Sequence, residues 1–179
     1  MYKAAGILPL ALNEQDDKVY MLLGSEPRRA SERKKGEKYG DVWWLGFGGK
    51  IEASDQGQSH LTALREFHEE SGGMFPDDPV FLSEPAWDPR AKYMFYVGQV
   101  PFTRELPSFT DEQARVCPTL NKRTLRWVPV SALAFLSPRG FDLKETDEFL
   151  PVKMWYAVLL YRERKRIVEA ANKLVRHET

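Results

Sequence analysis

The stretch that decides the fold is Arg65-Glu66-Phe67-His68-Glu69-Glu70-Ser71-Gly72, which follows Gly48-Gly49-Lys50-Ile51-Glu52 after a short gap. Its glutamates Glu66, Glu69 and Glu70 stand at positions i, i+3 and i+4, which share one face of an α-helix. Like charges at this spacing destabilise an isolated helix, so a bound cation is expected to offset the repulsion. Carboxylate oxygens suit Mg²⁺ or Mn²⁺, and such metals commonly act on phosphates. The spacing therefore predicts a divalent-metal site on this helix.

The helix that carries these acids is predicted to be amphipathic. At ~100° per residue, Leu61, Leu64 and Phe67 fall together, nearly opposite the three glutamates. This arrangement predicts an apolar side that packs on a sheet and an acidic side that faces a cleft. The helix is expected to begin with Ser59 as its N-cap and to stop at Gly72-Gly73.

The segment resembles the Nudix box, whose pattern is G-x5-E-x7-R-E-U-x-E-E-x-G-U, where U is a bulky aliphatic residue. The resemblance covers residues 48 to 73, where Gly49 fits the first glycine. The second half of the box is matched by one basic, three acidic, one aromatic and one glycine residue: Arg65, Glu66, Phe67, Glu69, Glu70 and Gly72. These residue types at fixed spacing rarely coincide by chance, so the second half is a specific signal.

The sequence departs from the box before the helix. Gly49 and Arg65 are two residues further apart than the pattern expects, and the extra length falls in residues 53 to 58, a predicted loop. The isolated middle glutamate is missing, and Asp55 or Gly57 stands there, depending on where the insertion lies. These departures leave the glutamate cluster intact and bear mainly on how the loop before the helix is held.

Composition bounds the class of protein. The chain has 179 residues, 42% of them hydrophobic, which suits one domain over residues 1–179 with a sizeable core. No apolar run approaches the ~20 residues of a membrane span, and the N-terminus lacks a signal-peptide pattern. The single cysteine, Cys117, excludes an internal disulfide framework and fits a reducing compartment, so a cytoplasmic location is expected.

Charge is balanced overall but uneven along the chain. The 26 basic and 26 acidic residues give a formal net charge of zero, unlike a general nucleic-acid coat protein. Basic residues nevertheless crowd residues 28 to 38, beginning with Arg28 and Arg29. This run could grip the phosphates of a long substrate such as capped RNA, or it could be a solvated loop.

Most of the predicted elements are strands, with two main helices among them. Apolar runs at 4–12 and 19–23, separated by a polar turn, predict a β-hairpin. Further strands are expected at 42–45, 80–82, 93–97 and 124–128, a helical turn at 131–136 and a long helix at 152–176. Strands mixed with two main helices fit an α/β fold, an α/β/α sandwich around a mixed β-sheet. That is the Nudix fold, which the resemblance also implies.

The resemblance implies Mg²⁺-dependent hydrolysis of a phosphoanhydride bond in a nucleoside diphosphate linked to another group. Glu66, Glu69 and Glu70 would hold the Mg²⁺, with Mn²⁺ as a substitute, and the backbone at Gly49 would complete the metal shell. Arg65 would orient a carboxylate and can pair with Glu69 at i+4. The expected catalytic residues are therefore Glu66, Glu69 and Arg65.

Two further sets of acids extend this interpretation. Glu52 is a further possible metal ligand. The base that activates water is one of the box glutamates or an acid in a later loop, where Asp111 and Glu112 lie.

Residues expected to contact the substrate lie outside the glutamate cluster: Trp44, Phe47, Lys50, Arg28 and Arg29. Aromatic rings can stack on any base, and arginine side chains contact phosphates. Trp43 and Trp44 alternate in a predicted strand, so one of the two is expected in the core.

Three classes of function stay open at this point. The first is a pyrophosphatase for a small nucleotide such as ADP-ribose, a sugar nucleotide, a dinucleotide or a dNTP. The second is an RNA decapping hydrolase, and the third is a non-catalytic module that binds nucleotide or RNA. Net neutrality and a single compact domain favour the first. The resemblance also leaves a homodimer open.

Overall fold

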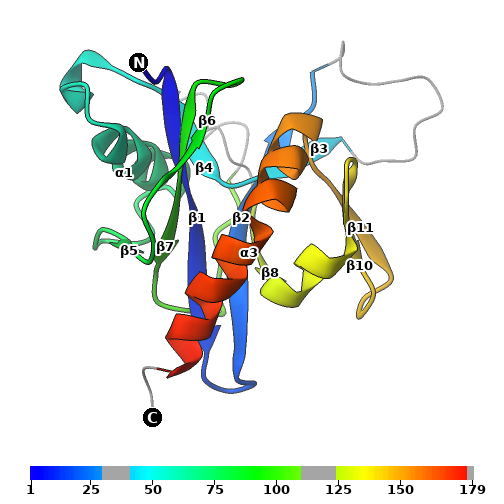
Figure 1. Ribbon diagram of the computed structural model, residues 1–179. Coiled ribbons are helices and arrows are strands. Elements are labelled where there is room, and N and C mark those ends of the chain that lie inside the picture. The colour runs from blue at the N-terminus through cyan, green and yellow to red at the C-terminus, as the bar shows by residue number, and fades with distance from the viewer. Residues whose placement is uncertain (30–40, 110–123, 177–179) are drawn as a thin grey trace.

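The computed structural model describes residues 1–29, 41–109 and 124–176. Its main sheet is built on a long antiparallel hairpin of β1 (Ala4–Asn13) and β2 (Lys18–Pro27). The strand β7 (Tyr93–Gln99) runs parallel to β1, and every other described pair of this sheet is antiparallel. The sheet is therefore mixed, as the sequence predicted (Figure 1).

The remaining strands extend this hairpin on both sides. Those that pair with β2 are β3 (Val42–Leu45) and β8 (Leu125–Pro129), and β4 (Phe47–Lys50) pairs with the start of β1. Two short strands, β5 (Val80–Phe81) and β6 (Ala86–Asp88), pair with β7. A second, antiparallel sheet contains β9 (Leu136–Ser137), β10 (Gly140–Leu143) and β11 (Glu148–Pro151).

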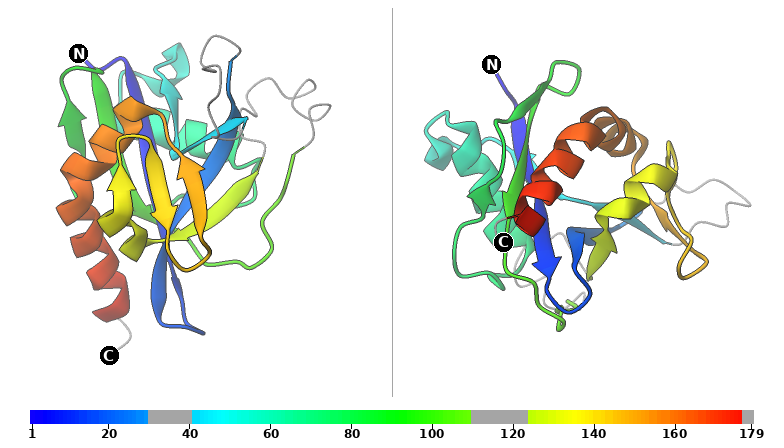
Figure 2. Two further views of the ribbon diagram at one scale, coloured as in Figure 1. Left: turned by 90° about the vertical axis from the view of Figure 1, so that its right-hand side faces the viewer. Right: turned by 60° about the horizontal axis from the view of Figure 1, so that its bottom comes forward.

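Two long helices cover opposite faces of the main sheet. The helix α1 (Ser59–Glu70) lies on one face and α3 (Met154–Arg176) on the other (Figures 1 and 2). Two 3₁₀ helices, η2 (Ala53–Asp55) and η3 (Val130–Phe135), precede α1 and the second sheet. The predicted α/β/α sandwich around a mixed sheet is confirmed.

The central strand β1 is apolar on both faces because it lies between the two helices. Ala5, Ile7 and Ala11 belong to the core under α1, whereas Leu8 and Leu10 belong to the core under α3. Successive side chains of a strand point to opposite faces, so one continuous apolar run serves both cores.

The boundaries of α1 correct one expectation and confirm another. The N-cap is Gln58, and the hydroxyl of Ser59 instead lies 2.7 Å from that of Tyr96 on the sheet. The glycine stop is confirmed, because Gly72 and Gly73 adopt φ of 66° and 68°, a conformation that glycine reaches without strain.

Three parts of the fold were missed from the sequence, the first of which is the short strand β6. Residues 47 to 50 were expected only to lead into the helix, but they form β4, which pairs with residues 4 to 7 of β1. The glycine pair in β4 lowers its strand propensity, so local sequence gives little signal there. The second sheet was also missed, because its strands are two to four residues long.

Several positions singled out in the sequence lie outside the described residues: 30–38, Asp111, Glu112 and Cys117. Among the described residues, none of the helices combines the length and apolar character needed to cross a membrane.

Candidate functional site

The helix α1 packs its acidic residues directly against β4. The carboxylate of Glu70 accepts a hydrogen bond from the Gly48 N–H at 2.9 Å and is 1% exposed. A Cβ atom at Gly49 would lie 2.2 Å from a carboxylate oxygen of Glu66. Only a strand without side chains at these positions can approach the two carboxylates so closely.

This packing corrects the expected orientation of α1. Its buried residues are Thr62, Ala63, Glu66, Phe67 and Glu70, so two of the three glutamates lie on the buried side beside Phe67. The prediction that all three acids face away from the apolar side was therefore wrong. Phe67 is fully buried as expected, and the glycines of β4 provide the room for the two carboxylates.

Arg65 is the centre of the acidic cluster. Its Nη1 lies 3.0 Å from Glu66, 3.2 Å from Glu69 and 3.7 Å from Glu52. Its Nη2 donates a hydrogen bond to the Lys50 carbonyl at 2.9 Å. One guanidinium thus joins α1 to the end of β4 and to the segment that follows it.

Asp55 is the buried partner of this guanidinium. Its carboxylate lies 3.0 Å from Nε of Arg65, and it accepts hydrogen bonds at 2.8 Å from the Thr62 hydroxyl and from the Glu52 N–H. Hydrogen bonding from Arg65, reinforced by these two donors against the opposing effect of burial, lowers the pKa of Asp55 to about 2. Asp55, rather than Gly57, is therefore the residue of the insertion that contacts the box arginine.

The cluster carries more negative than positive charge. Burial raises the pKa of Glu66, and the neighbouring charges of Glu69 and Glu52 raise it further, whereas Arg65 opposes the shift. Hydrogen bonding to Asp55 raises the pKa of Arg65, which keeps the guanidinium charged. Four carboxylates contact this one arginine, and the buried Glu70 lies against β4 nearby. This excess of negative charge, part of it buried, favours a bound cation.

The donor set fits a divalent metal in its chemistry. Carboxylate oxygens are the ligands that Mg²⁺ and Mn²⁺ prefer, and Glu66, Glu69 and Glu70 supply them beside the backbone of Gly49. The side chains are arranged around Arg65 and Gly48, and within the described part of the chain no three Asp, Glu, His or Cys side chains converge as metal ligands. The fit therefore rests on donor type and on the excess of negative charge.

Two buried tyrosines support the glycine strand from the side of α3. A Cβ atom at Gly48 would lie 2.3 Å from the Tyr93 hydroxyl, and one at Gly46 would lie 2.2 Å from the Tyr156 hydroxyl. Burial raises the pKa of both phenols, so both stay neutral. This role could not be predicted from the sequence, because the contacts join segments that lie far apart along the chain.

The expected substrate-stacking residues are in the core. Phe47 is 1% exposed and packs edge to face on Phe67 at 5.3 Å, and Trp44 is 9% exposed. Both rings are buried, so the stacking predicted for them is corrected. Trp43 is only partly buried, which confirms that one tryptophan of the pair belongs to the core.

The basic residues expected at the substrate differ in exposure. Arg28 is 5% exposed, and its guanidinium lies 4.1 Å from the ring centre of Trp43, so it stabilises the sheet edge by a cation–π contact. This burial corrects the expectation that Arg28 contacts phosphate. Arg29 and Lys50 are exposed, and Lys50 stands at the end of β4 next to the cluster.

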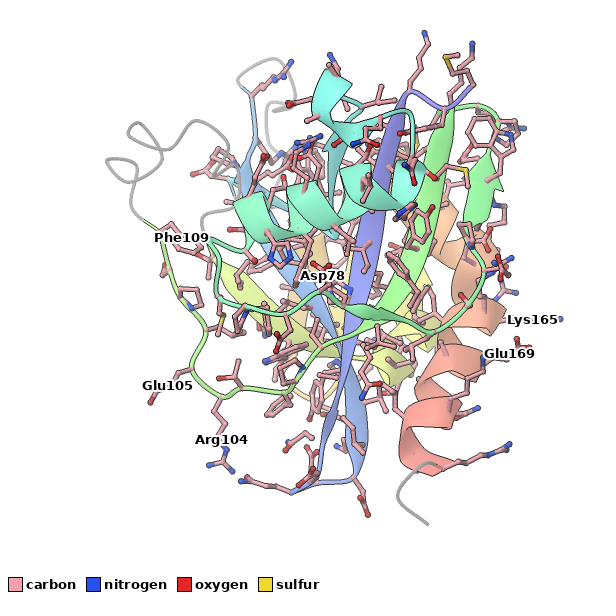
Figure 3. All side chains as sticks on the ribbon, turned by 90° about the vertical axis from the view of Figure 1, so that its left-hand side faces the viewer. Asp78, Arg104, Glu105, Phe109, Lys165 and Glu169 are labelled. Carbon is pink, nitrogen blue, oxygen red and sulfur yellow. The ribbon has the colours of Figure 1, made fainter. Side chains whose placement is uncertain are left out.

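A loop segment borders the C-terminal end of α1. The ring of Phe109 lies against Gly72, where an added Cβ atom would approach it to 2.7 Å (Figure 3). The chain therefore passes the end of α1 just before residues 110–123, which contain the two loop acids considered from the sequence.

Comparison with known proteins identifies the fold. No protein-family model and no curated protein matches the chain. Among solved structures, it is similar to the Nudix domain of Shewanella oneidensis NrtR, which was solved with ADP-ribose. That match has 13% identity, covers 93% of this chain and 88% of the other, and has a TM-score of 0.50.

Two further structures were also found. A mutT/nudix family protein from Listeria innocua has 16% identity over 93% of both chains, with a TM-score of 0.49. The Nudix hydrolase RenU from M. smegmatis has 16% identity over 95% of this chain and 88% of the other, with a TM-score of 0.48. The similarity to the NrtR domain, together with the mixed sheet and its two covering helices, shows that this chain has the Nudix fold.

Proposed function

We propose that this protein is a Mg²⁺-dependent hydrolase that cleaves a phosphoanhydride bond in a nucleoside diphosphate linked to another group. The observation that carries the proposal is the cluster of four carboxylates around Arg65, together with Glu70, which accepts a hydrogen bond from Gly48 of the glycine strand β4. The resemblance to the Nudix box supports it. The NrtR domain of the same fold was solved with ADP-ribose, which belongs to the proposed class of substrate.

The residues of the cluster have distinct roles in this proposal. Glu66, Glu69 and Glu70 would hold the metal, and a bound divalent ion would supply charge neutralisation and a more acidic water. The Gly48 N–H fixes one carboxylate oxygen of Glu70. Arg65 holds Glu66 and Glu69 side by side, so it is a positioning residue that acts through them.

Asp55 supports the cluster through its contacts with Arg65. Its two oxygens contact Nε and Nη2 of Arg65, which fixes the plane of the guanidinium. The remaining nitrogen, Nη1, is then directed at the glutamates. Groups that hydrogen-bond to metal ligands fix the orientation of those ligands. Arg65, held by Asp55, has this role towards Glu66 and Glu69.

The test is product release from a panel of nucleotides with and without Mg²⁺. The panel contains ADP-ribose, sugar nucleotides, dinucleoside polyphosphates, oxidised dNTPs and a capped RNA. Glu70→Gln is the test variant, and Asp78→Asn is the matched control, because Asp78 is an exposed acid whose partner is His68, outside the cluster (Figure 3).

Mg²⁺-dependent cleavage that Glu70→Gln abolishes and Asp78→Asn retains is the expected result. The substrate that is cleaved then names the class, and cleavage of capped RNA alone would assign the protein to decapping. Nucleotide binding by calorimetry with no turnover in either Mg²⁺ or Mn²⁺ would overturn catalysis in favour of a binding module.

A further inference from the structure

Two tyrosine hydroxyls lie against the glycines of residues 46 to 49, on the face of the sheet that α3 covers. A Cβ atom at Gly48 would come within 3.0 Å of the Tyr93 hydroxyl, and one at Gly46 would come within the same distance of the Tyr156 hydroxyl. The opposite face of this segment meets the carboxylate of Glu66. The segment therefore lies between phenol groups on one side and acids on the other.

Tyr93 places its hydroxyl in a slot formed by two glycines. It is the first residue of β7, and its side chain reaches across β1 to β4, where Gly6 and Gly48 are paired opposite each other. A Cβ atom on either glycine would overlap the hydroxyl oxygen. The Tyr93 ring packs edge to face on Trp155 at 5.7 Å, and the residue is 7% exposed. The hydroxyl thus fills the space that the two missing side chains leave.

Tyr156 brings its hydroxyl to the same segment from α3. It lies in the first turn of this helix and is 2% exposed. The residue just before the helix anchors this turn to β2, because Nζ of Lys153 forms an ion pair with Oε2 of Glu26 at 2.9 Å. The Tyr156 hydroxyl therefore meets Gly46 from a position that the contact between α3 and β2 fixes.

The strand that these hydroxyls touch also carries a donor to the acidic cluster. β4 has only four residues, two of them glycines, so its own pairing with β1 stabilises it little. Its Gly48 N–H nevertheless lies 2.9 Å from the carboxylate of Glu70. Any shift of β4 towards α3 or α1 would change this distance, so the groups that hold β4 also hold the donor.

The charges of the acids reach the phenols across this strand. Burial raises the pKa of Tyr93, and the neighbouring Tyr156 raises it further. The charges of Glu70 and Glu66 add to this rise, because they lie close by on the other side of β4. The hydroxyls and the acids are therefore near enough for one to influence the other.

We propose that Tyr93 and Tyr156 are positioning residues for the acidic cluster. Their hydroxyls fix the position of β4 between α3 and α1, and so the point from which the Gly48 N–H holds Glu70 (Figure 1). The inference rests on the proposed function, in which Glu70 is a metal ligand. If the tyrosines only filled the core, their rings would be enough. Variants that keep the ring and lose the hydroxyl separate the two roles.

Hydrogen exchange at the Gly48 amide tests the hold on β4 without metal or substrate. Tyr93→Phe is expected to speed this exchange by about tenfold or more, relative to the amides of β7 in the same NMR sample of the full-length protein. Tyr20→Phe is the matched control and should leave the rate unchanged. Its hydroxyl donates to Asp16 near the turn of the β1–β2 hairpin, at the other end of β1 from β4.

Mg²⁺ binding tests the consequence for the site. Calorimetry without nucleotide is expected to give a Kd about tenfold higher for Tyr93→Phe and for Tyr156→Phe, because losing a group that supports metal ligands costs about 10–100-fold. The value of kcat should fall by a similar factor. The KM for nucleotide should stay unchanged, because both residues are buried on the far side of β4 from the acids. Melting temperatures should stay close to that of the wild type, since each ring remains in place.

A compensating pair tests whether the hydroxyl itself contacts the strand. Gly46→Ala is expected to lower the melting temperature, because its Cβ atom meets the Tyr156 hydroxyl. Adding Tyr156→Phe should restore part of the loss, since the remaining neighbours are the Ile7 carbonyl oxygen at 3.0 Å and the ring Cζ at 3.2 Å. Adding Tyr20→Phe instead should restore nothing.

The outcomes separate this inference from the proposed function. Unchanged Gly48 exchange and unchanged Mg²⁺ affinity in both phenylalanine variants would overturn the inference, even for a wild type that cleaves nucleotides. The same holds for variants that melt well below the wild type but bind Mg²⁺ as tightly, since the tyrosines would then serve packing alone. A wild type that neither binds Mg²⁺ nor cleaves any nucleotide would overturn the proposed function and, with it, the positioning role.

Discussion

Nε of Arg65 lies 3.0 Å from Oδ1 of Asp55, and this contact joins α1 to the turn that precedes it. Asp55 is 2% exposed, so the pair is largely shielded from water. A shielded, charge-assisted contact is stronger than an ion pair on the surface. The insertion before the helix therefore supplies the residue that holds the central arginine of the site.

Asp55→Asn is expected to lower stability in a pH-dependent way. The folded-state pKa of about 2 lies below the ordinary value of 3.8, so the carboxylate stabilises the folded state above pH ~4. This contribution, on the order of 2 kcal/mol, is lost as the pH falls from about 4 to about 2. Denaturant unfolding of the wild type and the variant should show a stability difference that is largest at neutral pH. A difference that stays constant from pH 6 to pH 2.5 would contradict the assignment.

Glu70→Gln is expected to reduce turnover by ~100-fold or more, which corresponds to about 2.7 kcal/mol of activation free energy. The amide oxygen can still accept the hydrogen bond from the Gly48 N–H, so the fold should survive. Steady-state kinetics at saturating Mg²⁺ and thermal unfolding measure the two effects separately. An unchanged turnover would remove Glu70 from the site.

Gly49→Ala is expected to impair activity and leave stability nearly unchanged. The new Cβ atom would meet the carboxylate of Glu66 at 2.2 Å, and a flexible side chain can move away at little cost. Displacing this carboxylate should lower turnover by about 100-fold, since an error of 1 Å in position costs that much at a catalytic site. Its change in unfolding free energy should stay under about 1 kcal/mol.

Gly48→Ala is the companion variant. Its effect on stability should be larger than that of Gly49→Ala. Its Cβ atom would meet the backbone oxygen of Ala5 at 2.7 Å and the Tyr93 hydroxyl at 2.3 Å, and paired strands cannot separate freely. We expect a loss of about 1–3 kcal/mol in unfolding free energy. Equal effects of the two alanines on stability would contradict this account of β4.

Phe67→Ala tests the core under α1. Phe67 is fully buried and contacts the rings of Phe47 and Phe75, with ring centres 5.3 Å and 5.4 Å away. Truncation should cost about 3–5 kcal/mol, because it leaves a cavity between helix and sheet. Chemical denaturation measures this directly, and Leu64→Ala, at a half-buried position of the same helix, should cost less.

The sequence by itself determined the type and order of most elements. Continuous apolar runs separated by a polar turn predicted β1 and β2, the glycine pair predicted the end of α1, and the charge spacing predicted that Arg65 pairs with Glu69. These features depend on neighbours within one turn or one strand, so local physical chemistry is enough to predict them.

Only the tertiary structure decided which way the site faces. The approach of β4 to α1 buried Glu66 and Glu70 beside Phe67, and it placed Phe47 in the core instead of at a substrate. Helical angles show which residues share a face of α1. They do not show that β4 covers this face, because β4 is placed there by its pairing with β1, which is distant in sequence. Helical periodicity alone predicted only apolar contacts between α1 and the sheet. The glycines of β4 leave room for the carboxylates of Glu66 and Glu70 on that side as well.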